Sequence, residues 1–241
     1  MNQIYSHPRR KTKVVFVQLG SPSEPTTKAL RKYLRKFLGD PRVVDINPWL
    51  WKIILNFFVL PFRPKKSAKL YARIWDGKNF PLITNTRDFT NNVREELKKI
   101  DPNGYVEVNH AFLLSPPYVN EVYDSWEDDL KKGIGATKLL VIPMFPQYSE
   151  STIASGIDAL AKELSKRVKI PTFEVITNFH RTHAFIDNSV NQVDSKINEL
   201  QQEGKKVDNL IITFHGMQKR RIVNKGDDYY RHCYETFCLI T

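Results

Sequence analysis

Short apolar runs recur along this chain and alternate with longer stretches of helical periodicity. Val14–Val17 is the first run, and Leu210–Phe214 is the last. Runs of this length, rich in β-branched residues and bounded by turn residues, are typical of buried strands in a parallel sheet. The alternation therefore predicts an α/β fold with parallel sheets. We expect strands at residues 14–17, 43–46, 105–112, 138–142, 173–176 and 207–213, and helices at residues 26–39, 86–100, 119–130, 153–164 and 185–200.

Charge and composition indicate which classes of binding partner the protein could have. The 241 residues are 41% hydrophobic and 26% charged, which is ordinary for a soluble protein. The net charge of +11 favours an anionic partner such as nucleic acid, a phospholipid surface or a carboxylate-bearing ligand. We find no nucleic-acid-binding motif, and the Gly-rich signatures of nucleotide-binding loops are absent, so neither nucleic acid nor a nucleotide cofactor is expected.

Cysteine usage and the first residues bear on the compartment. Cys233 and Cys238 are the two cysteines, too few for a structural metal site unless other ligands join them. With no signal peptide, the sequence predicts free thiols in a reducing, cytoplasmic compartment. Residues Met1–Lys13 are polar and basic, and we expect a loose tail there.

Residues 47–66 contain an unusual density of large apolar side chains. The stretch is too short for a membrane span and is interrupted by Lys52, Asn56 and Pro61. It could be a core helix, or a partly exposed aromatic lip around an apolar ligand or at a membrane surface. We favour the lip, because so many large side chains are hard to bury on one helix. Basic residues beside it could meet lipid headgroups: Arg63, Lys65 and Lys66.

Three histidines and one helix start are candidates for function. His215 directly follows the last apolar run, at the strand end where chemistry collects in open α/β sheets. It could equally cap the strand or bond within a loop. His180 and His183 could share a helix face, but no third ligand is near, so we expect surface residues. The hydroxyl-rich segment Pro143–Thr152 could offer an anion the N–H groups of a helix start, or only cap that helix.

Several motifs occur in one order along the chain. They are Leu19-Gly20-Ser21-Pro22, Arg42-Val43-Val44-Asp45, Pro143-x-x-Pro146-Gln147-Tyr148-Ser149-x-Ser151-Thr152, Phe214-His215-Gly216 and Gly226-Asp227-Asp228-Tyr229. In this combination the chain resembles the ferrochelatase family, lyases of haem and porphyrin biosynthesis that insert ferrous iron into protoporphyrin IX to form haem b.

The resemblance implies a fold of two Rossmann-like domains around a porphyrin cleft. Residues 1–168 would form the N-terminal domain with the lip at 47–66, and residues 169–241 would form part of a second domain with an incomplete sheet. His215 would be the active-site histidine that accepts pyrrole protons, binds the metal, or both. Phe112, Tyr148 and Ser149 are weaker candidates for the substrate-binding wall of the cleft. Fe²⁺ would be a substrate, and no cofactor would be required.

This chain also departs from the family pattern. The family's glutamate across the cleft from the histidine, its second acidic metal ligand, is absent from this chain, and the family continues for roughly another domain. The family's Met-x-Tyr stretch reads His110-Ala111-Phe112. We therefore expect a truncated gene product or a diverging paralogue.

The leading hypothesis is a cytoplasmic ferrochelatase with peripheral membrane contact. The alternatives are a catalytically impaired fragment or paralogue that binds porphyrin or membrane without metallating, and a chelatase for cobalt. The sequence leaves the oligomeric state open.

Overall fold

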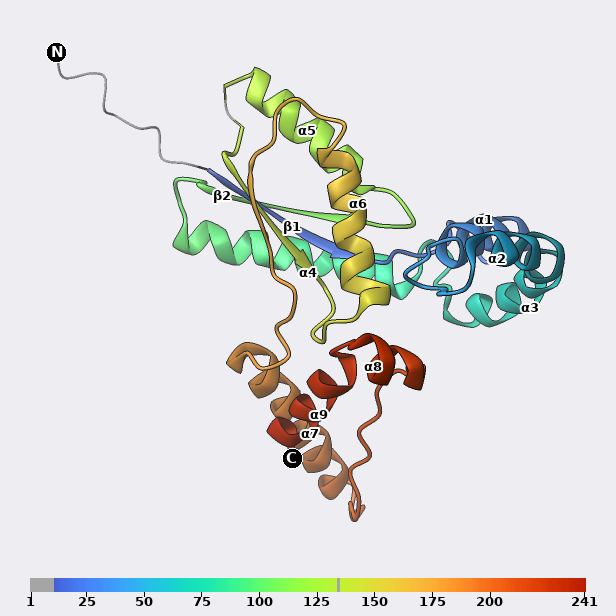
Figure 1. The fold of residues 1–241 in the computed structure, drawn as a ribbon. Coiled ribbons are helices and arrows are strands. Elements are labelled where there is room, and N and C mark those ends of the chain that lie inside the picture. The colour runs from blue at the N-terminus through green and yellow to red at the C-terminus, as the bar shows by residue number, and fades with distance from the viewer. Residues whose placement is uncertain (1–10, 134) are drawn as a thin grey trace. The chain divides into compact units, whose positions relative to one another are not determined.

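A run of residues that is apolar on both faces can be buried only where helices cover both sides of a sheet. In the computed structural model, Val14–Val17 lies in such a place, at the centre of strand β1 (Thr12–Gln18; Figure 1). The structure describes residues 11–133 and 135–241. Most of the expected basic tail Met1–Lys13 therefore lies outside the described residues.

One parallel sheet of four strands lies between residues 12 and 175. Its order is β2-β1-β3-β4, and Val15 of β1 lies opposite Asn109 on one side and Val141 on the other. The expected α/β fold with a parallel sheet is confirmed. Besides β1, the strands are β2 (Val106–Phe112), β3 (Lys138–Pro143) and β4 (Thr172–Val175).

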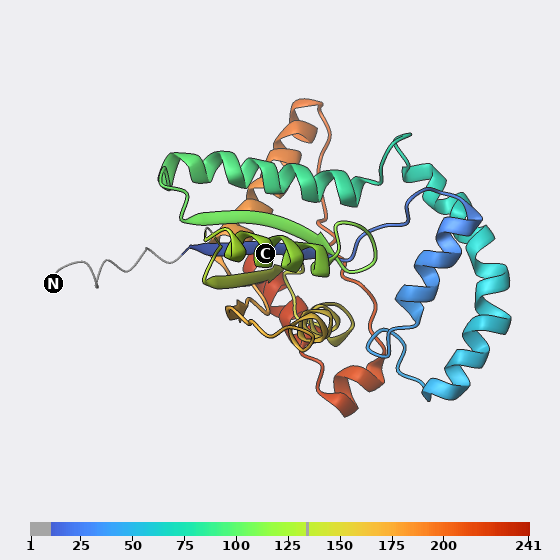
Figure 2. The same ribbon diagram turned by 90° about the horizontal axis from the view of Figure 1, so that it is seen from above.

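Helices cover the two faces of this sheet (Figure 2). Helix α4 (Pro81–Ile100) packs against the face that carries Val14 and Phe16. Helices α5 (Val119–Lys131) and α6 (Ser155–Leu164) cover the other face, where Val15 and Val17 point. Alternate residues of β1 therefore belong to opposite halves of the core, as the period of two requires. A π-helical turn, η3 (Glu150–Ala154), leads into α6.

A second small core lies between β1 and α4 in the sequence. Here α1 (Thr27–Leu38) packs against α3 (Leu60–Tyr71) through Leu34, Leu38 and Leu60. The hydroxyl of Thr26 accepts a hydrogen bond from Ala29 N–H and so caps α1. The other elements of this part are α2 (Pro48–Ile54), the π-helical turn η1 (Leu55–Val59) and the 3₁₀ turn η2 (Ala72–Ile74).

The aromatic lip, residues 47–66, is helical and largely exposed. Trp49 is 78% exposed, Phe62 is 73% exposed and Phe57 is 70% exposed, whereas Leu55 and Leu60 turn inward. The stretch is thus partly exposed and is not a buried core helix, whereas its role as a lip around a ligand or at a membrane stays a prediction. No helix in the described part of the chain combines the length and the apolar character needed to span a bilayer.

The strand predicted at residues 43–46 is wrong. The backbone N–H groups of Val43 and Val44 both donate to Asp40 C=O, and Arg42 N–H donates to the Asp40 carboxylate. Asp40 thereby curls the chain into a turn, which satisfies the backbone locally and leaves no extended segment for a ladder.

The chain divides into two units, and each is considered by itself. The first comprises Met1–Met144 and Ser151–Ile176, and the second comprises Phe145–Glu150 and Thr177–Thr241. Strand β4 pairs with β3 and so belongs to the first unit. The division consequently falls after Ile176 rather than at the expected 168/169, because ladder pairing ties residues 172–175 to the first sheet.

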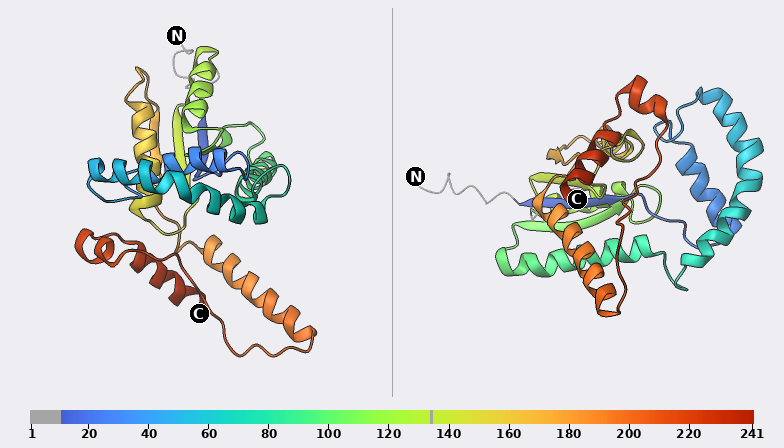
Figure 3. Two further views of the ribbon diagram at one scale, coloured as in Figure 1. Left: turned by 90° about the vertical axis from the view of Figure 1, so that its right-hand side faces the viewer. Right: turned by 90° about the horizontal axis from the view of Figure 1, so that it is seen from below.

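In the described residues the second unit contains three helices, which are drawn in orange to red (Figure 3). They are α7 (His183–Gln202), α8 (Lys219–Lys225) and α9 (Tyr229–Ile240), and α7 contacts α9. The segment predicted as a strand, residues 207–213, has no ladder partner among the described residues. Because a strand exists only through pairing, this segment is irregular, and Ile211 is 82% exposed.

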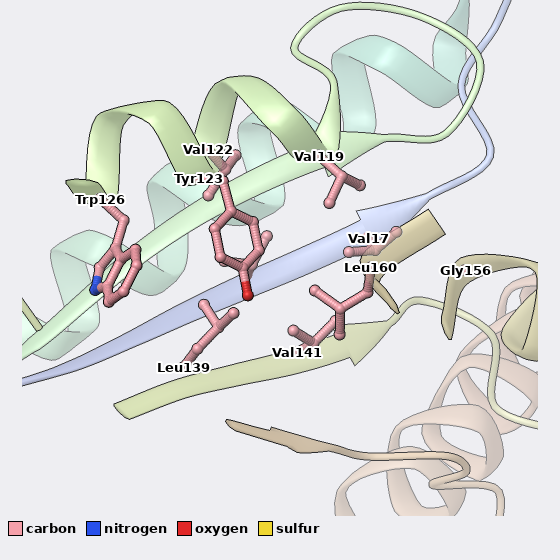
Figure 4. Close-up of a pocket in the computed structure, with 10 residues that line it drawn as sticks. Val17, Val119, Val122, Tyr123, Trp126, Leu139, Val141, Gly156 and Leu160 are labelled. Carbon is pink, nitrogen blue, oxygen red and sulfur yellow. The ribbon is translucent and has the colours of Figure 1, made fainter. Parts of the chain in front are cut away.

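The core of the first unit contains a small cavity, from which the effect of a substitution on stability can be predicted (Figure 4). A cavity of about 20 Å³ lies among valine, leucine and aromatic side chains, and Gly156 borders it. A Cβ added to Gly156 would meet no atom within 4 Å. We expect Gly156→Ala to raise the free energy of unfolding by about 1 kcal/mol, since alanine is the better helix former and also fills space. Urea denaturation measures this change.

Gly20→Ala is the matched control, for which we expect a change of opposite sign in the free energy of unfolding. Gly20 has φ +90°, and a Cβ there would lie 2.3 Å from the hydroxyl oxygen of Ser115. That variant should lose stability by about 1–2 kcal/mol or more. Stabilisation by Gly20→Ala, or destabilisation by Gly156→Ala, would contradict the packing described here.

Candidate functional site in the second unit

His215 lies in the irregular segment between α7 and α8, with an exposed side chain. Its backbone N–H donates a 3.0 Å hydrogen bond to the phenolic oxygen of Tyr229. Its imidazole bonds to no other residue in the described part of the chain. In the neutral ring, the nitrogen without a proton is therefore open to an incoming proton or metal ion, which are the two partners that imidazole commonly takes.

An apolar cavity borders His215. Its volume is about 380 Å³, which is at the lower end of the range for small-molecule sites. Cys233 is the one thiol in its wall. The rest of the wall is aliphatic and aromatic: Ile212, Phe214, Met217, Ile222, Tyr229, Tyr230, Tyr234 and Phe237.

Asp227 is a buried carboxylate that links separate parts of this unit. It is 4% exposed and follows Gly226, which ends α8 in the left-handed conformation with φ +69°. One carboxylate oxygen accepts from Tyr229 N–H at 3.0 Å. The other accepts from Glu150 N–H at 3.2 Å and from the Ser149 hydroxyl at 3.4 Å. Periodicity did not single out Asp227; its place in the Gly-Asp-Asp-Tyr motif was the available signal.

Residues 147–150, hereafter the clamped segment, are held along their length by α9 and the turn before it. The side-chain amide of Gln147 donates to the Thr236 hydroxyl at 3.0 Å. Tyr148 N–H donates to Nδ1 of His232 at 3.1 Å. Ser149 is only 2% exposed, and its hydroxyl is used by Asp227. Ser149 is thus linked to His215 through Asp227 and Tyr229, whereas Tyr148 bonds to His232; the contact of Tyr148 and Ser149 with a substrate stays a prediction.

His180 is not the surface residue that was expected. It is 2% exposed, and its Nε2 lies 2.7 Å from a carboxylate oxygen of Glu235 on α9. Its ring stacks on that of His232 with 3.9 Å between centroids. The correction has a simple cause: the residues that bury His180 come from α9, which the local sequence around His180 does not reveal. His183, by contrast, is exposed as expected.

Burial lowers the pKa of His232 below its ordinary value, and the neighbouring His180 and Arg231 lower it further. The neutral ring is the form that the structure needs, because only an unprotonated Nδ1 can accept the Tyr148 N–H. The hydrogen bond from His180 lowers the pKa of Glu235, so this carboxylate stays ionised.

Phe112 belongs to the first unit and ends strand β2. It is 1% exposed, and its ring meets that of His110 edge to face at 5.5 Å between centroids. Close by, Ser21 N–H donates to the Ser115 hydroxyl and holds the turn after β1. Phe112 also borders a cavity of about 430 Å³ beside α5 and α6. Its assignment to a cleft wall remains a prediction.

Preformed metal coordination is not a feature of the described residues. No group of three or more histidine, cysteine, aspartate or glutamate side chains gathers in the described part of the chain to hold an ion. The role of His215 as a metal ligand therefore stays a prediction.

Comparison with known proteins connects this site to a family. The sequence profile of the ferrochelatase family matches residues 11–241, which includes every residue of the network around Asp227. The chain belongs to the ferrochelatase family. It is 38% identical over 230 residues to the ferrochelatase of Idiomarina loihiensis, 36% identical over 227 residues to that of Marinobacter nauticus, and 34% identical over 241 residues to that of Francisella tularensis.

These ferrochelatases are longer than the chain that matches them. The aligned residues make up 95% of this chain but 60% of the Idiomarina protein. The corresponding shares are 94% and 58% for the Marinobacter protein, and 99% and 68% for the Francisella protein. The chain therefore spans about 60% of the length of the first two relatives, and both of its units lie within the matched part.

The buried His232 predicts a specific pH dependence of stability. Its pKa is depressed in the folded state, so between pH 6.5 and that lower value the unfolded chain binds more protons than the folded chain. Stability should fall as the pH falls through this window. Thermal unfolding between pH 7.5 and 5 measures the slope. His110, whose pKa burial also lowers, adds a slope of the same sign.

The contribution of His232 can be isolated by substitution. His232→Asn keeps an oxygen acceptor near the Nδ1 position but does not titrate, so the slope should become shallower. His183→Asn removes an exposed histidine and should leave the slope as in the wild type. An unchanged slope in His232→Asn would show that this imidazole does not titrate differently on folding.

Proposed function

We propose that this chain carries the proton-accepting part of a ferrochelatase, which inserts Fe²⁺ into protoporphyrin IX to form haem b. The observation that carries the proposal is His215: an exposed imidazole, anchored through its backbone, in the Phe-His-Gly motif of a chain from this family. In this reaction Fe²⁺ is a substrate, and no further cofactor is proposed.

The chemistry asked of His215 follows from the proton balance. Insertion of Fe²⁺ into a free-base porphyrin forms bonds from iron to four pyrrole nitrogens and releases two protons. A neutral imidazole offers one lone pair that can take a pyrrole proton and pass it to water, so that it acts twice in each turnover. The same lone pair could bind Fe²⁺ before transfer, and the two roles would then follow each other at one nitrogen.

A second candidate function is binding of porphyrin without metallation. It is favoured by one observation: in the described part of the chain, His215 belongs to no group of three or more side chains that could hold a metal ion. A metal path with a ligand on one side only should lose turnover more than porphyrin affinity. Insertion of cobalt instead of iron into a related ring is a variant of the first function, and it is tested with the same assay.

Membrane contact through the aromatic lip is the partner interaction that we propose. Large apolar side chains are exposed there beside three exposed cations, Arg63, Lys65 and Lys66. Side chains of this kind enter the headgroup region of a bilayer, and cations near them are attracted by anionic lipid. Contact with the membrane would also bring the protein to an apolar substrate such as porphyrin.

The proposal is tested by anaerobic Fe²⁺ insertion into protoporphyrin, followed through the loss of porphyrin fluorescence. We expect the wild type to turn over and His215→Ala to lose about 10²-fold or more in kcat, the usual contribution of a general base. His183→Ala is the matched control, and it should keep wild-type activity because His183 is exposed and bonded to no part of the network.

The outcomes separate the candidate functions. Turnover that survives His215→Ala would exclude this histidine as the proton acceptor. No turnover with porphyrin still bound by the wild type would favour the binding function. Formation of product with Co²⁺ but not with Fe²⁺ would show that cobalt, and not iron, is the metal substrate.

Lip contact is tested by sedimentation with vesicles of phosphatidylcholine containing phosphatidylglycerol. We expect Trp49→Ser with Phe62→Ser to weaken binding about tenfold or more, since burial of each large apolar side chain contributes about 1.5–3 kcal/mol when complete. Ile100→Ser, at an equally exposed position (79%) on α4, is the control and should bind as the wild type. Equal binding of all three proteins would exclude the lip as the contact.

A further inference from the structure

We propose that Tyr229 and Asp227 are positioning residues that fix the backbone of His215 relative to the clamped segment, residues 147–150. This inference rests on the proposed role of His215 as the proton acceptor. Neither Tyr229 nor Asp227 touches the reacting atoms in this scheme; each acts through the residue it holds.

The first step is the contact between Tyr229 and His215. In the described part of the chain, no backbone–backbone hydrogen bond holds residues 206–217. The 3.0 Å bond from His215 N–H to the Tyr229 phenolic oxygen is thus the polar anchor of the segment that carries the histidine. A phenylalanine at position 229 could fill the same space but would offer no acceptor.

The second step is the state of the phenol itself. Burial raises the pKa of Tyr229 to about 12, and a hydrogen bond with Cys233 adds to the increase. The hydroxyl is therefore protonated at neutral pH. A lone pair of this neutral hydroxyl is the acceptor for His215 N–H.

The third step is Asp227, which ties Tyr229 to the clamped segment. One carboxylate accepts from Tyr229 N–H and from Glu150 N–H, at 3.0 and 3.2 Å through its two oxygens. Because Asp227 is 4% exposed, water competes little for these bonds. The path from His215 to Glu150 consequently runs through two side chains, both inside the second unit.

The consequence for catalysis follows from geometry. A proton acceptor must sit within hydrogen-bond reach of the proton it takes, and displacement by about 1 Å can cost about 10²-fold in rate. An irregular segment with one polar anchor can drift by that much when the anchor is lost. Loss of the anchor should lower kcat and leave substrate binding nearly unchanged.

The first measurement uses the wild-type chain and needs no activity. Amide hydrogen exchange, read by NMR, should show His215 N–H protected at least tenfold relative to the amides of Thr213 and Gly216, which have no acceptor in the described part of the chain. If His215 exchanges as fast as these two neighbours, the anchor does not exist and the proposal is overturned. This measurement tests the anchor even if the chain does not metallate porphyrin. Failure of the proposed function can therefore be distinguished from failure of the present inference.

The second measurement compares variants. Tyr229→Phe should remove the protection of His215 N–H and lower kcat about 10- to 100-fold, with KM within twofold of the wild type. Tyr123→Phe is the matched control: it removes a buried hydroxyl that has no hydrogen-bond partner, and it should change neither quantity. Wild-type protection and kcat in Tyr229→Phe would overturn the proposal.

Asp227→Asn tests the other end of the path and guards against a folding defect in Tyr229→Phe. The amide keeps one oxygen acceptor but turns an N–H group toward Glu150 N–H or Tyr229 N–H, so one bond must be lost. We expect a smaller fall in kcat than in Tyr229→Phe, again with KM preserved. A rise in KM with unchanged kcat would show that these residues serve substrate binding and not the position of His215.

Discussion

Burial of strand β1 on both faces is the constraint on which the first unit depends. Val14 and Phe16 belong to one layer of the core, and Val15 and Val17 belong to the other. A strand of this kind can lie only at the centre of a parallel sheet, so β2 and β3 must flank it and helices must cover both sides. The cation of Lys13 is accommodated at the rim of this strand, where Glu107 and Asp129 lie within 3.5 Å of its ammonium group. Backbone bonds from Leu113 and Leu114 to Gln18 and Leu19 in turn fix the exit from β1.

The second unit is organised differently, by polar side chains. Its described residues form no ladder, and α7 has no fully buried residue. Instead, α9 and the turn before it collect hydrogen bonds from Gln147, Tyr148, Ser149 and Glu150. Buried polar groups must be paired. This requirement gives the unit one definite arrangement, whereas apolar burial alone would allow many arrangements. Of the residues that make these bonds, Gln147, Tyr148, Ser149 and Asp227 belong to motifs by which the sequence resembles its family.

Much of the fold was predictable because its signals are local. Four of the expected strands and the expected helices form, since an apolar run or a helical stripe is complete within its own stretch of sequence. The failures have one physical theme. At residues 43–46 one residue, Asp40, overrides β propensity through its backbone C=O and its carboxylate. At residues 207–213 the pairing that would define a strand is missing. His180 was misjudged because Glu235 and His232, which bury it, are distant in sequence.

In the candidate site, His215 was predicted from its place directly after an apolar run. The roles of Asp227 and Tyr229 are visible only in the contacts that the fold brings about.

The unpaired segment Leu210–Phe214 has a consequence for the behaviour of the chain in solution. All but Ile212 of these five residues are exposed and none is paired in a ladder, so the segment is a template on which another polypeptide can add a strand. The sequence sets charges on both flanks: Lys205 and Lys206 precede the segment, and Lys219 and Arg220 follow it. Like charges that approach one another during self-association repel, so these cations act as gatekeepers against fibrous stacking. Solubility of the isolated chain should thus depend on ionic strength, and added salt should bring copies together by screening the repulsion.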